Sequence, residues 1–474
     1  MGSEWKKASL TDHYEIRSGL SKPAKDFGSG YPFLTFKNVF YNYFVPSELT
    51  ELVQSTEKDR TGCSVMRGDV FLTRTSETMN ELGMSCVALK NYENATFNGF
   101  CKRLRPKTES ELVPEYVGYY LRSQKFRKDM LAFSTMSTRA SLNNDMIGRL
   151  EISYPSAAMQ NKIAHILKTL DNKITLNRQI NQTLEQMAQT LFKSWFVDFD
   201  PVIDNALDAI SNGQNIEIPE SLAKRFEARK AVRESEGFEP LPADIRQLFP
   251  CEFEESELGF VPKGWGYKPA QDIASISIGK TPPRKETEWF SDVKAKNVTW
   301  ISIRDMGNCG VFTQESNEYL VPEAISKFNV KVIPKDSVIL SFKMTLGRVS
   351  IASTELATNE AIAHFVNPKF GINKEYLYSY LMTFNYDSLG STSSIATAVN
   401  SKLIKQLPVL VPDSSILDTY FERVTGIFEK LQSVDCEVST LINLRDTLLP
   451  KLISGELRLD SLQGEALQQA VSAE

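Results

Sequence analysis

The chain has 474 residues, of which 42% are hydrophobic and 24% are charged, as is usual for a globular protein of about three structural units of ~150 residues. Its six scattered cysteines argue against a disulfide framework or a zinc site. With no apolar run of membrane-spanning length and no secretion signal, we expect a cytoplasmic protein without a membrane partner. The net charge of −5 does not exclude nucleic acid, because residues 198–257 hold 15 acidic and 6 basic side chains, which leaves +4 on the rest.

The first and the second half of the chain resemble each other. EWKKASLTDHYEIRSGLSKP aligns with GWGYKPAQDIASISIGKTPP at an offset of 260, so that Trp5 meets Trp265 and Gly19 meets Gly279. Three later stretches also match: RGDVFLTR (67–74) with PKDSVILS (334–341), PEYVGYYLRS (114–123) with KEYLYSYLMT (374–383), and LNNDMIGRLEISYP (142–155) with VNSKLIKQLPVLVP (399–412). We therefore predict two similar mixed α/β units, at residues 1–157 and 258–413.

A long amphipathic helix is expected after each copy, at residues 158–197 and 414–458. Hydrophobic residues recur there at alternating steps of three and four, which is typical of a coiled coil. A single helix of this length cannot bury its own stripe, so we expect the two helices to pack against each other, with the second returning along the first. Asn177 and Asn181 interrupt the first stripe; they are either buried, where they fix the register, or left at a solvent-facing edge.

Residues 198–257 carry the acidic excess and are expected to form a partly mobile linker or insertion. A short charged helix around Leu222–Arg233 precedes a loop that contains Pro240 and Pro242. Residues 459–474 are expected to form a polar tail. The predicted fold class is α+β: two pseudo-repeated mixed α/β domains joined by two long antiparallel coiled-coil helices.

The sequence holds no convincing catalytic motif. Gly279-Lys280-Thr281 resembles the end of a phosphate-binding loop, but Ala274 stands where that loop needs its first glycine, and the matching turn at Gly19 lacks the Lys-Thr pair. We therefore interpret this stretch as a structural turn that is used twice. None of the three histidines pairs with Cys or Ser in a known arrangement, and no amino-methyltransferase motif is found. We expect no catalytic residue, metal or cofactor in this chain.

Over essentially its whole length, the chain resembles the specificity (S) subunits of Type I restriction–modification enzymes. The resemblance rests on three stretches together with the two Gly-containing turns: LDNKITLNRQINQTLEQMAQTLFKSWFVDFDP (170–201), SELGFVPKGW (256–265) and LRDTLLPKLISGEL (444–457). It implies that each repeat is a target recognition domain that binds one half of a bipartite double-stranded DNA target, and that the helices set the gap between the halves.

The resemblance also implies the partners. The helices would dock two modification subunits, which bind S-adenosylmethionine and methylate adenine at N6. Restriction subunits would add translocation and cleavage that depend on ATP and Mg²⁺. The chain itself would be the non-catalytic subunit of this DNA methyltransferase and restriction endonuclease complex.

Three loop regions in each copy are rich in the side chains that contact bases and phosphates. They follow the early strand, follow the RGDVFLTR and PKDSVILS strands, and lie within residues 134–144 and 390–400. The candidate DNA-binding residues are Lys37, Asn38, Arg74, Thr75, Ser76 and Arg139 in the first copy and Arg304, Lys343, Thr345, Arg348 and Ser393 in the second. The alternative for each is an ordinary surface residue.

The helix segment 182–195 is the candidate docking face for the modification subunits. Phe192 and Trp195 are the expected contacts, together with Leu452, which aligns with Trp195; the alternative is that these residues belong to the chain's own core. For the whole chain, the alternative function is a non-catalytic, two-headed coiled-coil scaffold that holds protein partners without reading DNA. DNA binding that weakens steeply with salt would separate the two functions.

Overall fold

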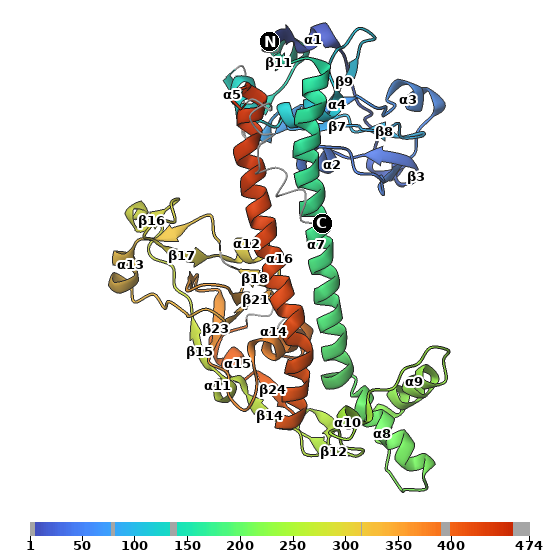
Figure 1. Cartoon of the computed structure of the whole chain (residues 1–474), viewed down its shortest axis with the longest axis vertical. Coiled ribbons are helices and arrows are strands. Elements are labelled where there is room, and N and C mark those ends of the chain that lie inside the picture. Colours follow the sequence, from blue (N-terminus) through green and yellow to red (C-terminus); the bar gives the residue numbers. More distant parts are fainter. Residues whose placement is uncertain (1–4, 77–80, 133–139, 314, 390–398, 458–474) are drawn as a thin grey trace. The chain divides into compact units, whose positions relative to one another are not determined.

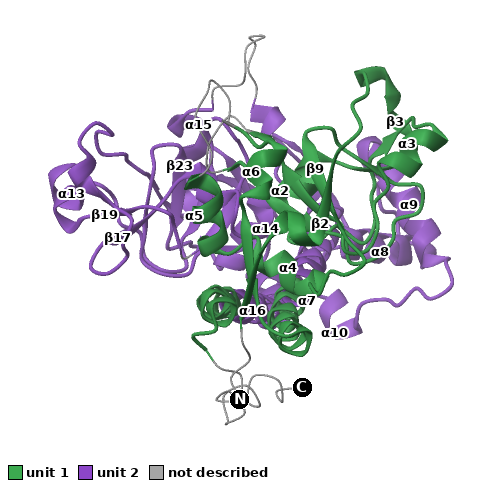
Figure 2. Cartoon of the chain, turned by 90° about the horizontal axis from the view of Figure 1, so that it is seen from above, with its two compact units in different colours: residues 1–175, 439–474 green, residues 176–438 purple. Residues whose placement is uncertain are grey.

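The computed structural model describes residues 5–76, 81–132, 140–313, 315–389 and 399–457. The chain divides into two compact units, one of residues 1–175 with 439–474 and one of residues 176–438 (Figure 2). We call them unit 1 and unit 2. Each contains one copy of the repeat, and the helices α7 (Ala157–Phe196) and α16 (Ser414–Ser454) contribute residues to both.

Unit 1 is built on an antiparallel four-stranded sheet in the order β2-β9-β5-β7 and on a three-stranded sheet in the order β4-β3-β8. The strands of these sheets are β2 (Tyr14–Ser18), β3 (Phe27–Leu34), β4 (Leu52–Val53), β5 (Val70–Thr73), β7 (Ser85–Val87), β8 (Thr96–Phe97) and β9 (Cys101–Pro106). Two further pairs are β1 (Lys6–Ser9) with β11 (Glu151–Tyr154) and β6 (Thr75–Ser76) with β10 (Ala140–Ser141). The short helices are α1 (Leu10–His13), η1 (Ala24–Asp26), α2 (Phe36–Tyr41), α3 (Glu57–Gly62), α4 (Pro114–Tyr120), α5 (Gln124–Ala132) and α6 (Asn144–Gly148).

Unit 2 contains a five-stranded sheet in the order β15-β23-β20-β21-β18 and a four-stranded sheet in the order β16-β19-β17-β22. Their strands are β15 (Ser275–Ile278), β16 (Phe290–Ser291), β17 (Val298–Ile301), β18 (Phe312–Thr313), β19 (Tyr319–Leu320), β20 (Val338–Ser341), β21 (Val349–Ala352), β22 (Ala357–Thr358) and β23 (Ile362–Val366). A further pair joins β14 (Gly266–Pro269) to β24 (Pro408–Val411). The short helices of this repeat are α11 (Ala270–Ile273), η4 (Thr287–Trp289), α12 (Ile303–Met306), α13 (Pro322–Lys327), α14 (Lys374–Thr383), η5 (Tyr386–Leu389) and α15 (Ser401–Lys405).

The two copies share one strand topology. The order β2-β9-β5-β7 of the first corresponds to β15-β23-β20-β21 of the second. The parallel pair β3–β8 corresponds to β17–β22, and the antiparallel pair β1–β11 corresponds to β14–β24. The internal repeat of the sequence is therefore a repeat of the fold, as predicted.

The turn at Gly279 is structural, and its counterpart at Gly19 has the same geometry. The Lys280 backbone N–H donates a hydrogen bond to the Thr358 carbonyl at 2.8 Å. A Cβ atom on Gly279 would overlap with the Thr358 hydroxyl and the Asn359 carbonyl, and a Cβ atom on Gly19 would likewise overlap with backbone carbonyls. Both positions need glycine because two backbone segments approach each other closely. The Gly-Lys-Thr stretch therefore has a structural role, as predicted, but residues 279–283 form a close approach of two backbone segments and no regular turn.

Within unit 2, the C-terminal half of α7 lies along the N-terminal part of α16 (Figure 1). Asn181 Nδ2 donates to Asp435 Oδ1 at 2.5 Å, and the rings of Phe196 and Tyr420 pack with centroids 5.0 Å apart. Partner numbers fall on α16 as they rise on α7, so these segments are antiparallel, as predicted. Asn177 is 2% exposed, so the asparagines of the stripe are buried or partly buried rather than left at a solvent-facing edge.

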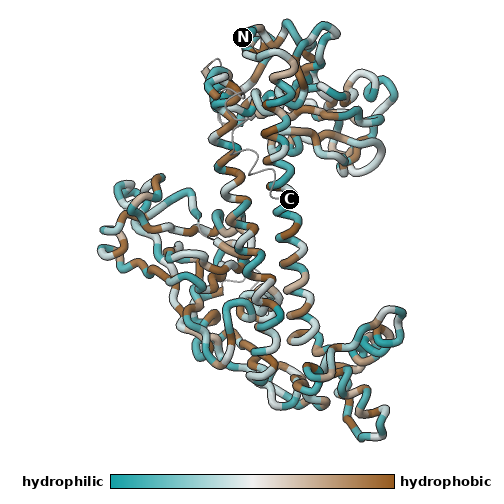
Figure 3. The backbone as a smooth tube through the Cα atoms, viewed as in Figure 1, coloured by the Kyte–Doolittle hydropathy of each residue, from teal (hydrophilic) through white to brown (hydrophobic). Residues whose placement is uncertain are grey.

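Within unit 1, the remaining parts of the two helices pair in the same sense. Arg445 on α16 donates to Asp171 on α7 at 2.8 Å, and Tyr119 on α4 donates its hydroxyl to the same carboxylate at 2.7 Å. Figure 3 shows hydrophobic and hydrophilic residues alternating along both helices, which is the pattern of a helix with one buried face. In unit 1 that face packs into a core with Leu449 and Leu452.

Residues 198–257 contain more structure than the expected partly mobile linker. They form α8 (Asp200–Ser211), η3 (Glu220–Leu222), α9 (Ala223–Arg233), α10 (Ala243–Arg246) and β12 (Phe253–Ser256), and β12 pairs with β13 (Gly259–Pro262). The acidic side chains of α8 bind the arginines of α9 and α10: Arg229 donates to Asp204 at 2.6 Å, and Asp208 accepts from both Arg233 and Arg246. The sequence did not indicate these ion pairs, because the aspartates lie on α8 and the arginines that bind them lie on α9 and α10.

Replacing Gly279 with alanine should destabilise unit 2 by about 1–3 kcal/mol, because the added methyl group must displace backbone atoms and the Thr358 hydroxyl. Chemical denaturation measures the change. Gly266→Ala is the matched control, since nothing lies within 4 Å of a Cβ atom at that position. Equal stability of the two variants would contradict the role assigned to this turn.

Asp435→Asn should raise stability at pH 7.5. Burial, together with the nearby Glu185 carboxylate, raises the pKa of Asp435 from 3.8 to about 6, although the bond from Asn181 opposes the shift. A raised carboxyl pKa favours folding at low pH, and this contribution is lost as the pH rises through about 6. Allowing for partial exposure, we expect a gain of about 1–2 kcal/mol at pH 7.5 that disappears near pH 4.

Urea denaturation at both pH values measures this difference. The exposed Asp418, on the same helix, supplies the control variant Asp418→Asn, for which no change is expected. A gain for Asp435→Asn that is equal at both pH values would show that the carboxyl charge is not its cause.

Candidate nucleic-acid interface

The helix α2 follows β3 and carries the first candidate residues. Thr35 caps it: the Thr35 hydroxyl accepts from the Asn38 backbone N–H at 3.1 Å, and Asn38 Oδ1 accepts from the Thr35 backbone N–H at 3.0 Å. This capping box fixes the first turn of the helix. The carbonyl of the Asn38 side chain is therefore used within the chain, whereas Lys37 points its side chain into solvent.

The helix α12 repeats this arrangement in the second copy. The Ser302 hydroxyl accepts from the Asp305 backbone N–H at 3.3 Å, and Asp305 Oδ2 accepts from the Ser302 backbone N–H at 2.9 Å. Arg304 occupies the same helical position as Lys37 and is likewise exposed. Two strands with equivalent pairings thus each lead into a capped helix that presents one cation.

The loop between β20 and β21 contains three more candidates. The Ser341 hydroxyl donates to the Thr345 carbonyl at 2.5 Å and accepts from the Arg348 backbone N–H at 3.0 Å, which holds both sides of the loop. The Arg348 guanidinium donates to the Ile303 carbonyl at 2.7 Å. Arg348 therefore ties the loop to α12, while Lys343 and Thr345 are exposed beside it. The structure brings these candidates together with the helix that carries Arg304.

The corresponding loop of the first copy is held in the same way. The Thr73 hydroxyl donates to the Glu81 carbonyl at 3.2 Å and accepts from the Met84 backbone N–H at 2.9 Å. Arg74 is the next residue after Thr73. Burial lowers the pKa of Lys102, and the positive charge of Arg74 lowers it further. Two cations this close repel each other, an arrangement that an anionic ligand would relieve.

Sequence inspection missed Lys102 because it lies on β9 and not in a loop. It also missed Arg122, at the end of α4, whose guanidinium donates to the Ser85 carbonyl at 2.7 Å. The same guanidinium donates to the carbonyls of three residues at the end of α2: Val39 at 2.8 Å, Phe40 at 2.9 Å and Asn42 at 2.8 Å. Arg122 therefore fixes α2 as Arg348 fixes α12. Comparison of the two repeats could not reveal this role, because Arg122 aligns with Met382 in the second copy.

The other candidates occupy different positions. Thr75 and Ser76 form β6, which pairs with Ser141 and Ala140 of β10. Arg139 and Ser393 lie outside the described residues.

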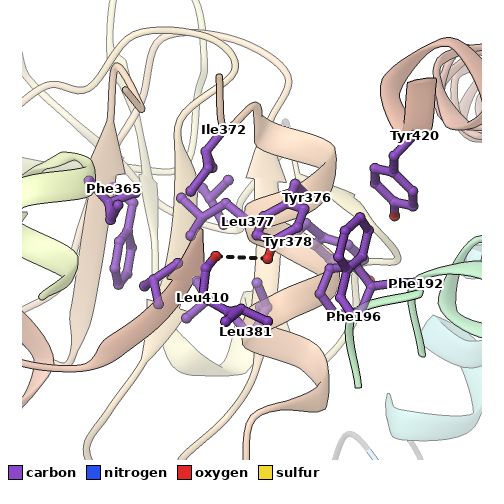
Figure 4. Close-up of a cluster of buried hydrophobic side chains, with 14 of the residues drawn as sticks. Phe192, Phe196, Phe365, Ile372, Tyr376, Leu377, Tyr378, Leu381, Leu410 and Tyr420 are labelled. Atoms are coloured by element: carbon purple, nitrogen blue, oxygen red, sulfur yellow. Dashed lines mark hydrogen bonds between the residues drawn. The ribbon is translucent and has the colours of Figure 1, made fainter. Parts of the chain in front are cut away.

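The expected docking residues Phe192, Trp195 and Leu452 do not form an exposed face. All three are at most 1% exposed. In unit 2, the Phe192 ring packs against Tyr376 and Tyr420, with centroids 5.2 and 6.0 Å away (Figure 4). The Trp195 ring packs against Phe249, with centroids 5.0 Å apart. In unit 1, Leu452 belongs to the core of the first copy. The expectation of docking contacts is therefore corrected in favour of its alternative, the chain's own core.

The Ser277–His364 pair most resembles a nucleophile with a base. Ser277 Oγ lies 2.9 Å from His364 Nδ1, but the other ring nitrogen lies 2.7 Å from Thr358 Oγ1. The imidazole is fully buried, and burial lowers its pKa to about 4. A neutral ring between two hydroxyl groups of a sheet has a structural role here.

Among the described residues, no group of three or more His, Cys, Asp or Glu side chains is placed to hold a metal ion. Within the same ranges, no helix combines the length and hydrophobicity that crossing a bilayer requires.

Comparison with known proteins identifies the family. The sequence model described as the Type I restriction modification DNA specificity domain matches residues 2–186 and 262–435, that is, both copies of the repeat. The chain belongs to this family of specificity subunits.

Curated relatives match this specificity subunit along its length. It is 32% identical to the Type I restriction enzyme HindI specificity subunit of Haemophilus influenzae, over 96% of this chain and 100% of that protein. It is 24% identical to the MjaIX specificity subunit of Methanocaldococcus jannaschii, over 97% of this chain and 95% of that one. The crystal structure of the Type-I system S subunit from M. genitalium shares the fold, with a TM-score of 0.51 and 13% identity over 95% and 96% of the two chains.

Replacing Arg348 with alanine should destabilise this specificity subunit more than replacing Arg304 with alanine. Arg348→Ala removes a charged hydrogen bond and should lower stability by about 1–3 kcal/mol. Arg304→Ala changes an exposed side chain and should alter stability by less than about 0.5 kcal/mol. Urea denaturation of the full chain measures both, and equal losses would contradict the positioning role of Arg348.

Proposed function

We propose that each repeat of this specificity subunit binds one half of a bipartite double-stranded DNA target. In this proposal α7 and α16 set the gap between the halves and dock two modification subunits. The chain contributes no catalytic residue. Adenine N6 methylation belongs to the modification subunits with their S-adenosylmethionine, and restriction subunits use ATP and Mg²⁺ in a cytoplasmic complex.

The observation that carries the proposal is the recurrence of one cation on one scaffold position. Lys37 and Arg304 are exposed at the same position of twin capped helices, although the loops around them differ in sequence. A scaffold repeated with different surface residues suits a protein that reads two different DNA half-sites. In each repeat the cation lies on a helix that a half-buried arginine holds in place, so it can approach a phosphate or a base edge in a defined geometry.

Methylation-sensitive long-read sequencing tests this function in a host that expresses the chain with its modification subunit. The expected result is a split motif with N6-methyladenine in both halves, absent when this chain is omitted. Lys37→Ala and Arg304→Ala should each lower the methylated fraction of the motif, because each removes one DNA contact.

The control is Glu217→Gln, an exposed change between α8 and η3 that lies outside both repeats and both long helices, for which the methylated fraction should be unchanged. A complex that forms and methylates no motif would refute DNA reading and favour the scaffold function. Salt-independent DNA binding by the purified complex would lead to the same conclusion.

A further inference from the structure

Met344 is the most exposed large hydrophobic residue among those described, with 99% of its surface accessible. It stands at the tip of the loop between β20 and β21. Its backbone is in the left-handed region, with φ of +59°, and the Thr345 N–H donates to the Lys343 carbonyl at 2.7 Å across it. This hydrogen bond closes a tight turn around Met344.

A methionine is a poor choice for this backbone conformation. Side chains with a Cβ atom are disfavoured at positive φ, where glycine or asparagine is usual. The Met344 side chain makes no compensating packing contact, because it is fully exposed. A strained residue with an exposed apolar side chain suggests a function for that side chain outside the folded chain.

The loop holds Met344 in a defined position. The Ser341 hydroxyl joins both sides of the loop, and Gly347 (φ +89°) donates its N–H back to the Ser341 carbonyl at 3.0 Å. Arg348 ties the loop to α12. The side chain therefore projects from a braced hairpin and not from a freely moving segment.

The neighbours of Met344 are those of a DNA-contacting residue. Lys343 and Thr345 flank it and are exposed, and α12, which carries the exposed Arg304, is bonded to the same loop. One carboxylate, Glu360, is near Lys343, but its side chain hydrogen-bonds Thr281. The first copy also places an exposed apolar residue at this edge: Phe100 is 61% exposed, and its carbonyl accepts from the Arg74 N–H at 2.9 Å.

We propose that Met344 is a specificity-determining residue of the second repeat and contacts the 5-methyl group of a thymine in the major groove. Thymine carries the apolar group on the major-groove edge of the base pairs, and an adaptable thioether fits it well. In this arrangement Lys343 binds a neighbouring phosphate. The proposal rests on the proposed function, because it requires that this repeat bind DNA.

Met344→Gly provides the first test, since glycine removes the side chain and adopts the observed backbone without strain. The variant should fold and assemble as the unchanged protein does. In long-read sequencing, its methylated motif should relax at one A·T pair of one half-site and keep every other position. Met382→Ala, a change of an exposed methionine on α14 of the same repeat, should leave the motif unchanged.

The second test removes the thymine methyl group from the DNA. The assembled complex is titrated with a duplex that carries the methylated motif, with deoxyuridine at the relaxed position. The unchanged protein should bind the deoxyuridine duplex about three- to tenfold more weakly than the thymine duplex. Met344→Gly should bind both duplexes equally.

Each alternative result overturns the proposal. An unchanged motif in Met344→Gly shows that the side chain reads no base, and a motif without an A·T pair in the affected half shows that no thymine is read. If Met344→Gly weakens binding to the thymine duplex and to the deoxyuridine duplex by the same factor, the side chain does not contact the thymine methyl group. If the unchanged protein also increases the fluorescence of an adjacent 2-aminopurine, Met344 inserts between bases instead. If the unchanged protein produces no motif, the proposed function itself fails, and this outcome is distinct from those above.

Discussion

The long helices have no core of their own, so the fold depends on how each repeat buries part of them. In unit 1, Tyr119 on α4 donates to Asp171 on α7 at 2.7 Å; in unit 2, Tyr378 on α14, which aligns with Gly118 and lies one position away from the counterpart of Tyr119, donates to Glu185 on α7 at 2.6 Å. Both phenols are buried, and burial together with the neighbouring carboxylate raises their pKa values. One tyrosine per repeat thus joins the core of that repeat to a carboxylate on α7.

The aromatic cluster of unit 2 explains why α7 ends where it does. The last turns of α7 contain Phe192, Trp195 and Phe196. The Phe192 ring packs against Tyr376, and the rings of Trp195 and Phe196 pack against Tyr420. Edge-to-face contacts dominate, which is the favoured geometry for such rings. The chain then turns at Phe199, whose φ is +59°, into α8. Residues that resembled a partner surface in the sequence therefore join the helix to the second repeat.

Periodicity and self-similarity predicted the parts of the fold that obey simple rules. The offset of 260 found the repeat and the glycine turn, and the three-four spacing found both helices and their pairing. Burial of Phe192, Trp195 and Leu452 was not predictable in the same way, because an apolar residue on a helix stripe has the same pattern whether a core or a partner covers it. The contacts of Arg122 and Arg348 were also beyond sequence reasoning. They bind backbone carbonyls, which leave no trace in residue type, and Lys102 was missed because it lies on a strand.

The paired hydroxyls of Thr73 and Ser341 have a consequence for how this protein can change. Each hydroxyl lies at the end of a strand and donates to a carbonyl on the far side of the loop. A glycine with positive φ, Gly83 in the first copy and Gly347 in the second, follows on that far side. Between these anchors the first copy has residues 74–82 and the second has the shorter stretch 342–346. Loops of unequal length are thus accepted by the same pair of anchors while the sheet beneath stays intact. A change in the length of the segment between these anchors therefore need not disturb the sheet, so this is a place where the chain can vary while its fold is kept.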